Sequence, residues 1–346
     1  MNEARSEPVE DWTAPGVFEV APGVHRIPLP LPNDGLRAVN VYAVHDGDRL
    51  VLIDSGWAIP QARQRLADAL QGLGRSLADV SRFLITHVHR DHYTQAIGLR
   101  REFGSTVSLG AGERQSLAVI QAPGRPPLEP QLHQLRLYGA AGLAEQIAAG
   151  LAAHRGTDRS DWESPDDWLE PGVLTLAAGR TLAVIETPGH TRGHVVFHDV
   201  AAGLLFAGDH VLPTITPSIG FEPVLSPNPL GDFLAALAKV RALPDAVLLP
   251  AHGDVTGSVH ARIDELVAHH GARLDQTIAA LASGVDTAAA VAGELRWTRR
   301  LRTLSELDSF NQMLAVAETG AHLDLLLAQG RLTRVVEEGC YRYRLS

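Results

Sequence analysis

Four potential metal ligands within six positions constrain this chain more than any other feature of its sequence. The segment Thr86-His87-Val88-His89-Arg90-Asp91-His92 follows Phe83–Thr86, a brief apolar run typical of a strand. Imidazole and carboxylate groups hold zinc and related divalent ions, and ligands on a loop can reach two neighbouring ions. A polar surface loop is the alternative, but it leaves the density of ligands unexplained. The segment therefore predicts a metal site at a strand end.

Further potential ligands follow three later apolar runs: His190 and His194 after Leu182–Glu186, Asp209 after Leu204–Ala207, and His252 after Ala246–Leu249. Strand ends converge at one edge of a sheet, so these side chains can meet the first cluster. One histidine or aspartate at a strand end is more often a capping or core residue. The metal site is indicated by the set as a whole.

Residues 17–260 are expected to form one α+β domain after an N-terminal lead of residues 1–16. Strands are predicted at Val17–Ile27, Ala38–His45 and Leu50–Asp54, and helices at Gln61–Leu73 and Leu230–Leu243. Residues 111–171 interrupt this pattern with the Pro-rich stretch Ala122–Pro130, the helical segment Leu132–His154 and the acidic, Trp-containing stretch Asp158–Glu170. We expect this insertion to form a lid or a substrate wall.

Residues 261–346 are predicted to form a separate, winged-helix-like domain. Helices are expected at Arg262–Ala282, Thr287–Leu295 and Leu307–Gln329, and a β-hairpin at Arg331–Glu337 and Tyr341–Leu345. The segment Arg296–Arg302 is basic and contains a tryptophan, as nucleic-acid sites often do. The whole region nevertheless has ten arginines against eleven acidic residues and carries no basic excess.

Composition narrows the expected partners. The net charge of −10 disfavours nucleic acid and anionic lipid, because both require a basic surface. Cys340 is the only cysteine, the first 16 residues lack the features of a signal peptide, and no apolar run is long enough to span a membrane. We expect a cytoplasmic protein that acts on a small molecule without membrane contact. A homodimer remains open.

The H-x-H-x-D-H stretch, the stretch Thr187–His194 (TPGHTRGH), Gly208-Asp209 and His252 together resemble the metallo-β-lactamase superfamily, in particular its glyoxalase II and β-lactamase-like protein 2 branches. The likeness extends roughly from Val17 to Ser346. It implies an αββα sandwich, with two sheets inside, helices outside and the metals at one edge.

The resemblance implies two divalent ions, with zinc expected and Mn²⁺ or Fe²⁺ as alternatives. It also implies these ligands: His87, His89 and His190 for the first ion, Asp91, His92 and His252 for the second, and Asp209 bridging both. Asp54 would brace the histidine loop, or would merely form a turn after a strand. His194 would have a structural hydrogen-bonding role, and His210, His269 and His270 would be ordinary structural or surface residues.

Two positions distinguish the chain from many members of this family. Tyr93-Thr94-Gln95-Ala96 stands where many relatives have small residues and a glycine pair, so Tyr93 would line the pocket or pack against the neighbouring helix. Aspartate rather than cysteine stands at the bridging position, which disfavours the single-zinc lactamase type.

The expected reaction is hydrolysis of a thioester or ester, lactones included, of a small acyl substrate. Two ions that share a water lower its pKa to roughly 7 and so supply hydroxide at neutral pH. Asp91 would orient that water and pass its proton to the leaving group, and Asp209 would hold both ions. The alternatives are a ribonuclease or phosphodiesterase, a mononuclear iron persulfide dioxygenase, and a non-catalytic winged-helix regulatory protein.

Overall fold

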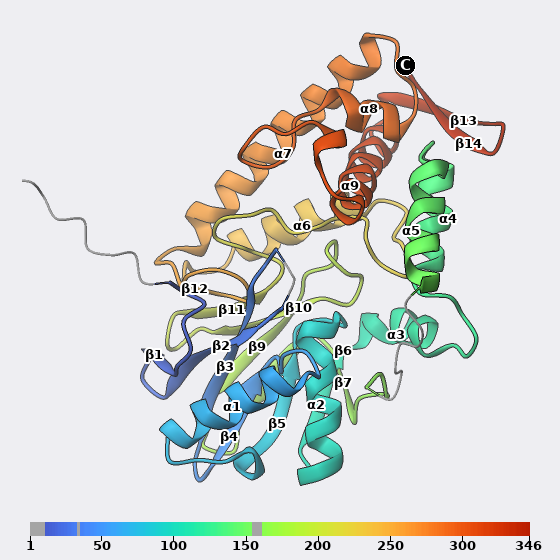
Figure 1. Cartoon of the computed structure of the whole chain (residues 1–346). Coiled ribbons are helices and arrows are strands. Elements are labelled where there is room, and N and C mark those ends of the chain that lie inside the picture. The colour runs from blue at the N-terminus through green and yellow to red at the C-terminus, as the bar shows by residue number, and fades with distance from the viewer. Residues whose placement is uncertain (1–10, 33–34, 154–160) are drawn as a thin grey trace, which may run out of the picture.

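Two β-sheets packed face to face form the centre of the molecule (Figure 1). The computed structural model describes residues 11–32, 35–153 and 161–346. In the first sheet the strands lie in chain order, antiparallel from β1 to β4 and parallel from β4 to β7. They are β1 (Phe18–Ala21), β2 (Val24–Pro30), β3 (Ala38–Asp46), β4 (Arg49–Ile53), β5 (Val80–Ile85), β6 (Thr106–Gly110) and β7 (Asp167–Leu169).

The second sheet has the order β12-β11-β10-β9-β8. Its strands are β8 (Gly172–Thr175), β9 (Thr181–Glu186), β10 (Val195–Asp199), β11 (Leu204–Gly208) and β12 (Val247–Pro250). All neighbours are antiparallel except β11 and β12, which run parallel. Both sheets are therefore oriented so that several strands end at the same edge.

Three apolar layers hold the sandwich together. Side chains such as Tyr42, Ile53 and Phe206 fill the space between the sheets. Helices α1 (Pro60–Gly72) and α2 (Arg90–Phe103) pack on the outer face of the first sheet, and α6 (Pro229–Arg241) packs on the second. This arrangement confirms the predicted αββα sandwich. Outside residues 111–171, β3, β4, α1 and α6 agree with the strands and helices expected there. The stretch Val17–Ile27 was expected as one strand but forms β1 and β2, which pair antiparallel, and α2 was not expected.

The insertion at 111–171 differs from its prediction in two respects. Leu132–His154 is not one helix: α4 (Glu129–Leu137) ends before Gly139, which has a φ of +84°, and α5 (Ala141–Ala153) starts after it. His154 lies outside the described residues. The acidic stretch, described from residue 161 onward, contains β7, which extends the first sheet next to β6. The remaining helix of the insertion is α3 (Arg114–Gln121).

The C-terminal region has the elements that its sequence predicted. These are α7 (Val259–Ala282), α8 (Ala288–Glu294), α9 (Ser309–Ala328) and a hairpin of β13 (Leu332–Glu337) and β14 (Cys340–Leu345). Short 3₁₀ turns lie at Leu77–Asp79, Ala111–Glu113 and Leu304–Glu306. The winged-helix class and the domain boundaries stay predictions.

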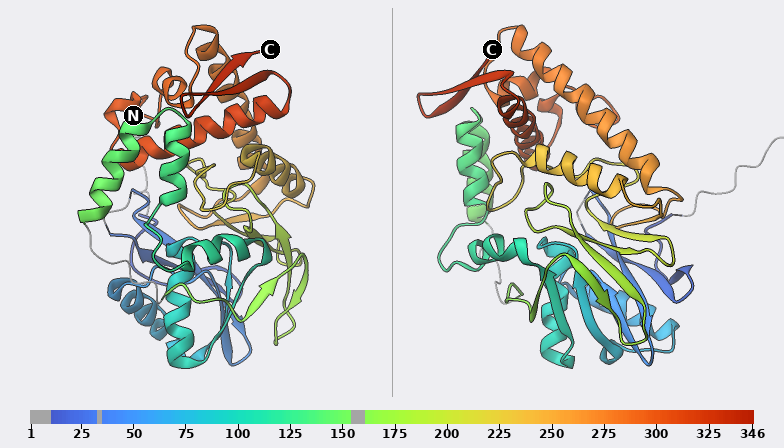
Figure 2. Two further views of the ribbon diagram at one scale, coloured as in Figure 1. Left: turned by 90° about the vertical axis from the view of Figure 1, so that its right-hand side faces the viewer. Right: turned by 180° about the vertical axis from the view of Figure 1, so that it is seen from behind.

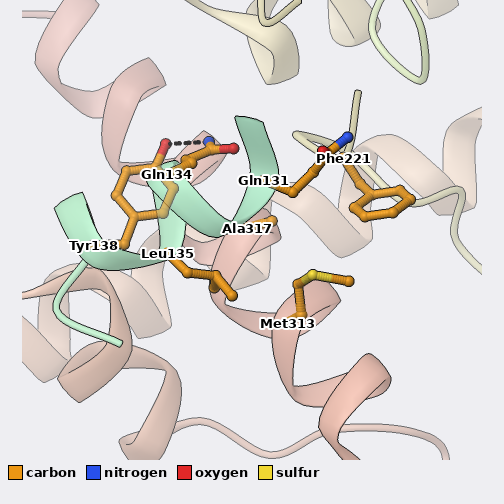
Figure 3. Close-up of a pocket in the computed structure, with 7 residues that line it drawn as sticks. All are labelled: Gln131, Gln134, Leu135, Tyr138, Phe221, Met313 and Ala317. Carbon is orange, nitrogen blue, oxygen red and sulfur yellow. Dashed lines mark hydrogen bonds between the residues drawn. The ribbon is translucent and has the colours of Figure 1, made fainter. Parts of the chain in front are cut away.

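Helices α4 and α5 share one apolar core with the C-terminal elements, and Figure 2 shows them beside α9. Leu132 and Leu135 of α4 and Ala144 of α5 belong to the same cluster as Leu323 of α9 and Tyr343 of β14. In Figure 3 the side chains of α4, of α9 and of the loop at Phe221 surround a common recess. The insertion therefore packs on the C-terminal unit. No helix among the described residues has the length and apolar character needed to cross a membrane.

Candidate metal centre

Every predicted ligand lies just beyond the carboxyl end of a strand, at one edge of the sandwich. His87 and His89 follow β5, and Asp91 and His92 lie in the first turn of α2. The remaining three are contributed by the second sheet: His190 after β9, Asp209 directly after β11, and His252 after β12. Their imidazole and carboxylate groups form two clusters, each of which could hold a metal ion.

The first cluster consists of His87, His89, His190 and Asp209. The Nδ1 atom of His89 lies 2.9 Å from Nε2 of His87 and 3.0 Å from Nε2 of His190. The Oδ2 atom of Asp209 lies 3.4 Å from Nε2 of His190 and 4.0 Å from Nε2 of His87. Three ring nitrogens and one carboxylate oxygen thus converge on one point.

The second cluster consists of Asp91, His92 and His252. The Oδ2 atom of Asp91 lies 3.6 Å from the Nε2 atoms of both histidines. The Oδ1 atom of Asp209 lies 3.3 Å from Nε2 of His252 and 3.7 Å from Nε2 of His92. The two oxygens of Asp209 therefore face different clusters, as the prediction of a bridging carboxylate requires.

The unsatisfied polar atoms show that these side chains fit a pair of divalent ions. The Nε2 atoms of His92 and His252 and the Oδ1 atom of Asp209 are buried and have no hydrogen-bond partner. Buried polar atoms normally have a hydrogen-bond partner. Three buried atoms without one, all facing the same space, are expected if that space holds metal ions. Tetrahedral zinc with nitrogen and oxygen ligands would place the ligand atoms about 3.3 Å apart, close to the distances found here.

Burial and charge set the protonation of the ligands. Burial lowers the pKa of His89 to about 3 and that of His190 to about 4, so both rings are neutral and keep a lone pair for a cation. Burial also opposes the charged form of His92. The carboxylates of Asp54, Asp91 and Asp209 outweigh this effect and raise the pKa of His92 to about 10. A cation among these carboxylates would replace that proton.

The second ring nitrogen of three ligands is held by a fixed acceptor. The Nδ1 atom of His92 lies 2.9 Å from Oδ2 of Asp54, that of His190 lies 2.8 Å from the carbonyl oxygen of Ser218, and that of His252 lies 2.8 Å from the carbonyl oxygen of Ala38. In the neutral ring, a proton that Nδ1 donates to an oxygen leaves Nε2 unprotonated and facing the cluster.

Asp54 is hydrogen bonded to the histidine loop, which agrees with the bracing interpretation of this residue. It follows β4 with a φ of +61°. Its Oδ1 atom accepts a hydrogen bond from the main-chain N–H of Thr86 at 2.8 Å, and Oδ2 accepts one from His92. The carboxylate thus fixes both ends of the ligand segment.

His194 has the hydrogen-bonding role expected of it. Its Nδ1 atom lies 2.8 Å from the hydroxyl oxygen of Thr187, and its Nε2 atom accepts a hydrogen bond from the main-chain N–H of Asp209 at 3.1 Å. This ring thus holds Asp209, the residue predicted to bridge the two ions. His210 is fully buried beside it, with 6.0 Å between the ring centroids.

Tyr93 packs in the interior and is not exposed at the site. Its side chain belongs to the core under the first sheet and stacks on Trp162, with 6.2 Å between the ring centroids. Its hydroxyl donates to the carbonyl oxygen of Glu163. Of the two interpretations of Tyr93, the structure thus agrees with packing and not with a pocket wall, because the ring fills the contact between α2 and the inserted segment.

A third cluster, His269, His270 and Glu318, lies between α7 and α9. His270 is fully buried, and its Nδ1 atom lies 3.2 Å from Nε2 of His322. The guanidinium of Arg273 lies close enough to act on the pKa of Glu318 and of both histidines. Because His270 is buried and lies against His322, we interpret this cluster as a structural contact between α7 and α9, as the sequence suggested for the histidine pair.

The sequence analysis missed four residues that support the predicted ligands: Ala38, Glu113, Ser218 and Glu222. Glu113 and Glu222 are buried carboxyl groups that contact the two ligand loops. Ser218 contributes only a main-chain oxygen, which no sequence pattern marks. Glu113 alone had a visible signal, because it is an acidic residue directly after Gly110-Ala111-Gly112, where a short apolar run ends.

Comparison with known proteins gives a consistent result. The profile described as "Metallo-beta-lactamase superfamily" matches residues 34–252. The chain is 26% identical over 317 residues to "Probable metallo-hydrolase YqjP" of Bacillus subtilis, a match that covers 89% of this chain and 92% of that protein. It is 26% identical over 247 residues to "Atrochrysone carboxyl ACP thioesterase" of Emericella nidulans, covering 71% of this chain and 61% of that protein.

A further relative, "Beta-lactamase-like protein 2 homolog" of Drosophila melanogaster, is 24% identical and is matched over 70% of this chain and 68% of its own length. Among solved structures, a metallo-β-lactamase family protein of Thermus thermophilus superposes with a TM-score of 0.77 at 28% identity, covering 95% of this chain and all of that one. The profile covers well over half of the chain and includes all seven predicted ligands. The chain therefore belongs to the metallo-β-lactamase superfamily, and its site has the form of a metallo-hydrolase centre.

Proposed function

We propose that this protein hydrolyses a thioester or ester of a small acyl substrate, using two divalent ions, with zinc as the expected metal. The position of Asp209 carries the proposal, because its two carboxylate oxygens face separate ligand clusters. His87, His89 and His190 would hold one ion, and Asp91, His92 and His252 the other. When bound, the ions supply an activated water and polarise the substrate's carbonyl oxygen.

The protein's own residues orient the reactants. Asp91 is the most exposed carboxylate of the site, with 14% of its side chain accessible against 9% for Asp209. It can therefore accept a hydrogen bond from the attacking water and deliver a proton to the leaving group. Asp54 and His194 are buried, and they hold His92 and Asp209 in place. Their role is to preserve the geometry in which the reaction occurs.

Acyl substrates are favoured over nucleic acid by charge and by the position of Trp297. The net charge of −10 opposes binding of a polyanion. Trp297 is only 8% exposed, its ring nitrogen donates to the carbonyl oxygen of Ala292, and the guanidinium of Arg273 lies 4.2 Å from its ring centroid. This tryptophan cannot stack on a base, so the basic segment around it lacks the aromatic surface that nucleic-acid sites use. The similarity to a thioesterase supports the same choice.

The test is a substrate panel of acyl-CoA and glutathione thioesters, lactones, a phosphodiester and single-stranded RNA, each with zinc, manganese and iron. We expect metal-dependent cleavage of the acyl compounds, loss of that activity in His89→Ala, and wild-type activity in the control His133→Ala, which alters an exposed histidine of α4. Cleavage of RNA without cleavage of acyl compounds would overturn the proposal in favour of the nuclease. One iron per chain with sulfur-dependent oxygen uptake would favour the dioxygenase. Binding of metal with no turnover of any substrate would favour a regulatory protein.

A further inference from the structure

Glu113 is a fully buried acidic residue that the proposed reaction does not use. It lies at the end of the 3₁₀ turn Ala111–Glu113, directly after β6 of the first sheet. Burying a carboxyl group costs free energy unless hydrogen bonds replace its contacts with water. The contacts of Glu113 indicate its role.

One carboxylate oxygen of Glu113 contacts both loops that carry the first cluster of ligands. The Oε1 atom accepts a hydrogen bond from the main-chain N–H of Val88 at 3.3 Å and another from the hydroxyl of Thr191. Val88 stands between the ligands His87 and His89, and Thr191 directly follows the ligand His190. The first loop leaves the first sheet and the second leaves the second sheet. Glu113 therefore joins the two halves of the sandwich at the metal site.

Close main-chain contact fixes Glu113 against the second loop. A Cβ atom added at Gly112 would lie 2.7 Å from the Cα atom of Gly193, and one added at Gly193 would lie 2.1 Å from the nitrogen of Glu113. No side chain fits between these segments. From the same second loop, the main-chain N–H of Arg192 donates to Glu222 at 2.9 Å. Two buried carboxyl groups thus hold the residues that follow His190.

We propose that Glu113 is a positioning residue that sets the distance between His190 and the pair His87 and His89, and with it the affinity for the first ion. The proposal rests on the proposed function only in taking these histidines as ligands. Glu113 touches neither the ligand atoms nor the space between them. It acts through Val88 and Thr191.

The remaining properties of Glu113 agree with this role better than with a role in stability. Its Oε2 atom is buried without a hydrogen-bond partner, and burial raises its pKa to about 7. A group retained for stability alone would be fully hydrogen bonded or replaced by an apolar side chain. Residues that break this rule are expected near functional sites.

The experiment measures zinc affinity by competition with a chromogenic chelator, for wild type, Glu113→Ala, Glu113→Gln and the exposed control Glu145→Gln of α5. Groups that hold metal ligands in place typically change affinity by about 10- to 100-fold when removed. In Glu113→Ala we expect zinc affinity to fall by this factor at one of the two sites and to stay unchanged at the other. Glu113→Gln retains an acceptor for Val88 and Thr191 and should lose less. The control should bind as wild type does.

The melting temperature of each metal-free variant is recorded alongside. Wild-type zinc affinity in Glu113→Ala would overturn the proposal, and so would an affinity loss that appears only when the metal-free fold is lost as well. Should Glu113→Ala fail to fold, Thr191→Val removes one of the two hydrogen bonds while preserving volume, and it must weaken zinc binding. A wild-type protein that binds two zinc ions but hydrolyses no acyl compound would refute the proposed function and leave this affinity test intact.

Discussion

Replacing Asp54 by asparagine tests how the second ligand cluster is held. Asparagine has the same shape, tolerates the positive φ of +61°, and can still accept a hydrogen bond from the main chain of Thr86. Its amide nitrogen would lie where Oδ2 now stands, 2.9 Å from Nδ1 of His92. Two donors would then face each other. The neutral His92 ring that a cation requires can restore the hydrogen bond only by carrying its proton on Nε2, the atom that faces Asp91 and Asp209.

The size of the effect follows from the bond that is lost. A hydrogen bond to a charged group contributes roughly 1.5–3 kcal/mol, which corresponds to about a 10- to 150-fold change in affinity. We expect Asp54→Asn to weaken the second ion by this factor, because a protonated Nε2 atom cannot bind a cation. The first cluster should be spared, since Asp54 contacts none of its ring nitrogens directly.

Metal content after dialysis against a graded series of buffered zinc concentrations would show the difference. Wild type should take up two ions per chain, and Asp54→Asn should reach one ion at concentrations that fill both sites of wild type. Asp48→Asn, in the exposed turn between β3 and β4, is the matched control. If Asp54→Asn binds two ions with unchanged affinity, the carboxylate does not set the orientation of His92, and the reasoning is wrong.

Three other predictions concern different parts of the chain. Gly208→Ala should destabilise the protein by about 2–3 kcal/mol or more and impair metal binding, because Gly208 has a φ of +50° and an added Cβ would lie 2.7 Å from Nε2 of His194. Thermal unfolding measures the stability and metal analysis the ion content. A variant that is as stable as wild type and binds two ions would contradict this prediction. Tyr93→Phe should lower the free energy of unfolding by about 1 kcal/mol, through loss of the hydrogen bond to Glu163, and should leave the metal content unchanged. Loss of metal in this variant would show that Tyr93 contributes to the metal site. Burial raises the pKa of Asp324 from 3.8 to about 6, so the folded state holds this proton more tightly than the unfolded state does. The stability linked to the proton is therefore present below pH 4 and lost as pH rises toward 6. Chemical denaturation at several pH values should show wild type losing stability relative to Asp324→Asn across that window, and a stability difference that does not change with pH would refute the pKa shift.

The metal site could be predicted from sequence because its ligands are dense and each follows a strand. Strand order was not needed, since any sandwich whose two sheets bring the carboxyl ends of β5, β11 and β12 to one edge brings His87, Asp209 and His252 together. The residues that support the ligands were harder to foresee. The oxygens that orient His190 and His252 belong to the main chain of Ser218 and Ala38, where side-chain identity carries no information.

The insertion shows a second limit of sequence reasoning. Its helical periodicity is real, but Gly139 separates two helices, and the apolar faces of both are matched by residues more than a hundred positions away. Local patterns cannot reveal that partner. The strand at Asp167–Leu169 has only three residues, which is too short to show the alternation that identifies longer strands.

Helix α7 connects the β-sandwich rigidly to the C-terminal elements, which a flexible linker would not do. Val259 and Ile263 near its start pack beneath the second sheet, whereas Ala280 and Leu281 near its end pack among α8, α9 and the hairpin. A stiff rod of 24 residues thus spans both cores. A truncated protein that ended at residue 260 would expose the apolar faces of α4 and α5 to solvent. We therefore expect the β-sandwich and the C-terminal elements to unfold together.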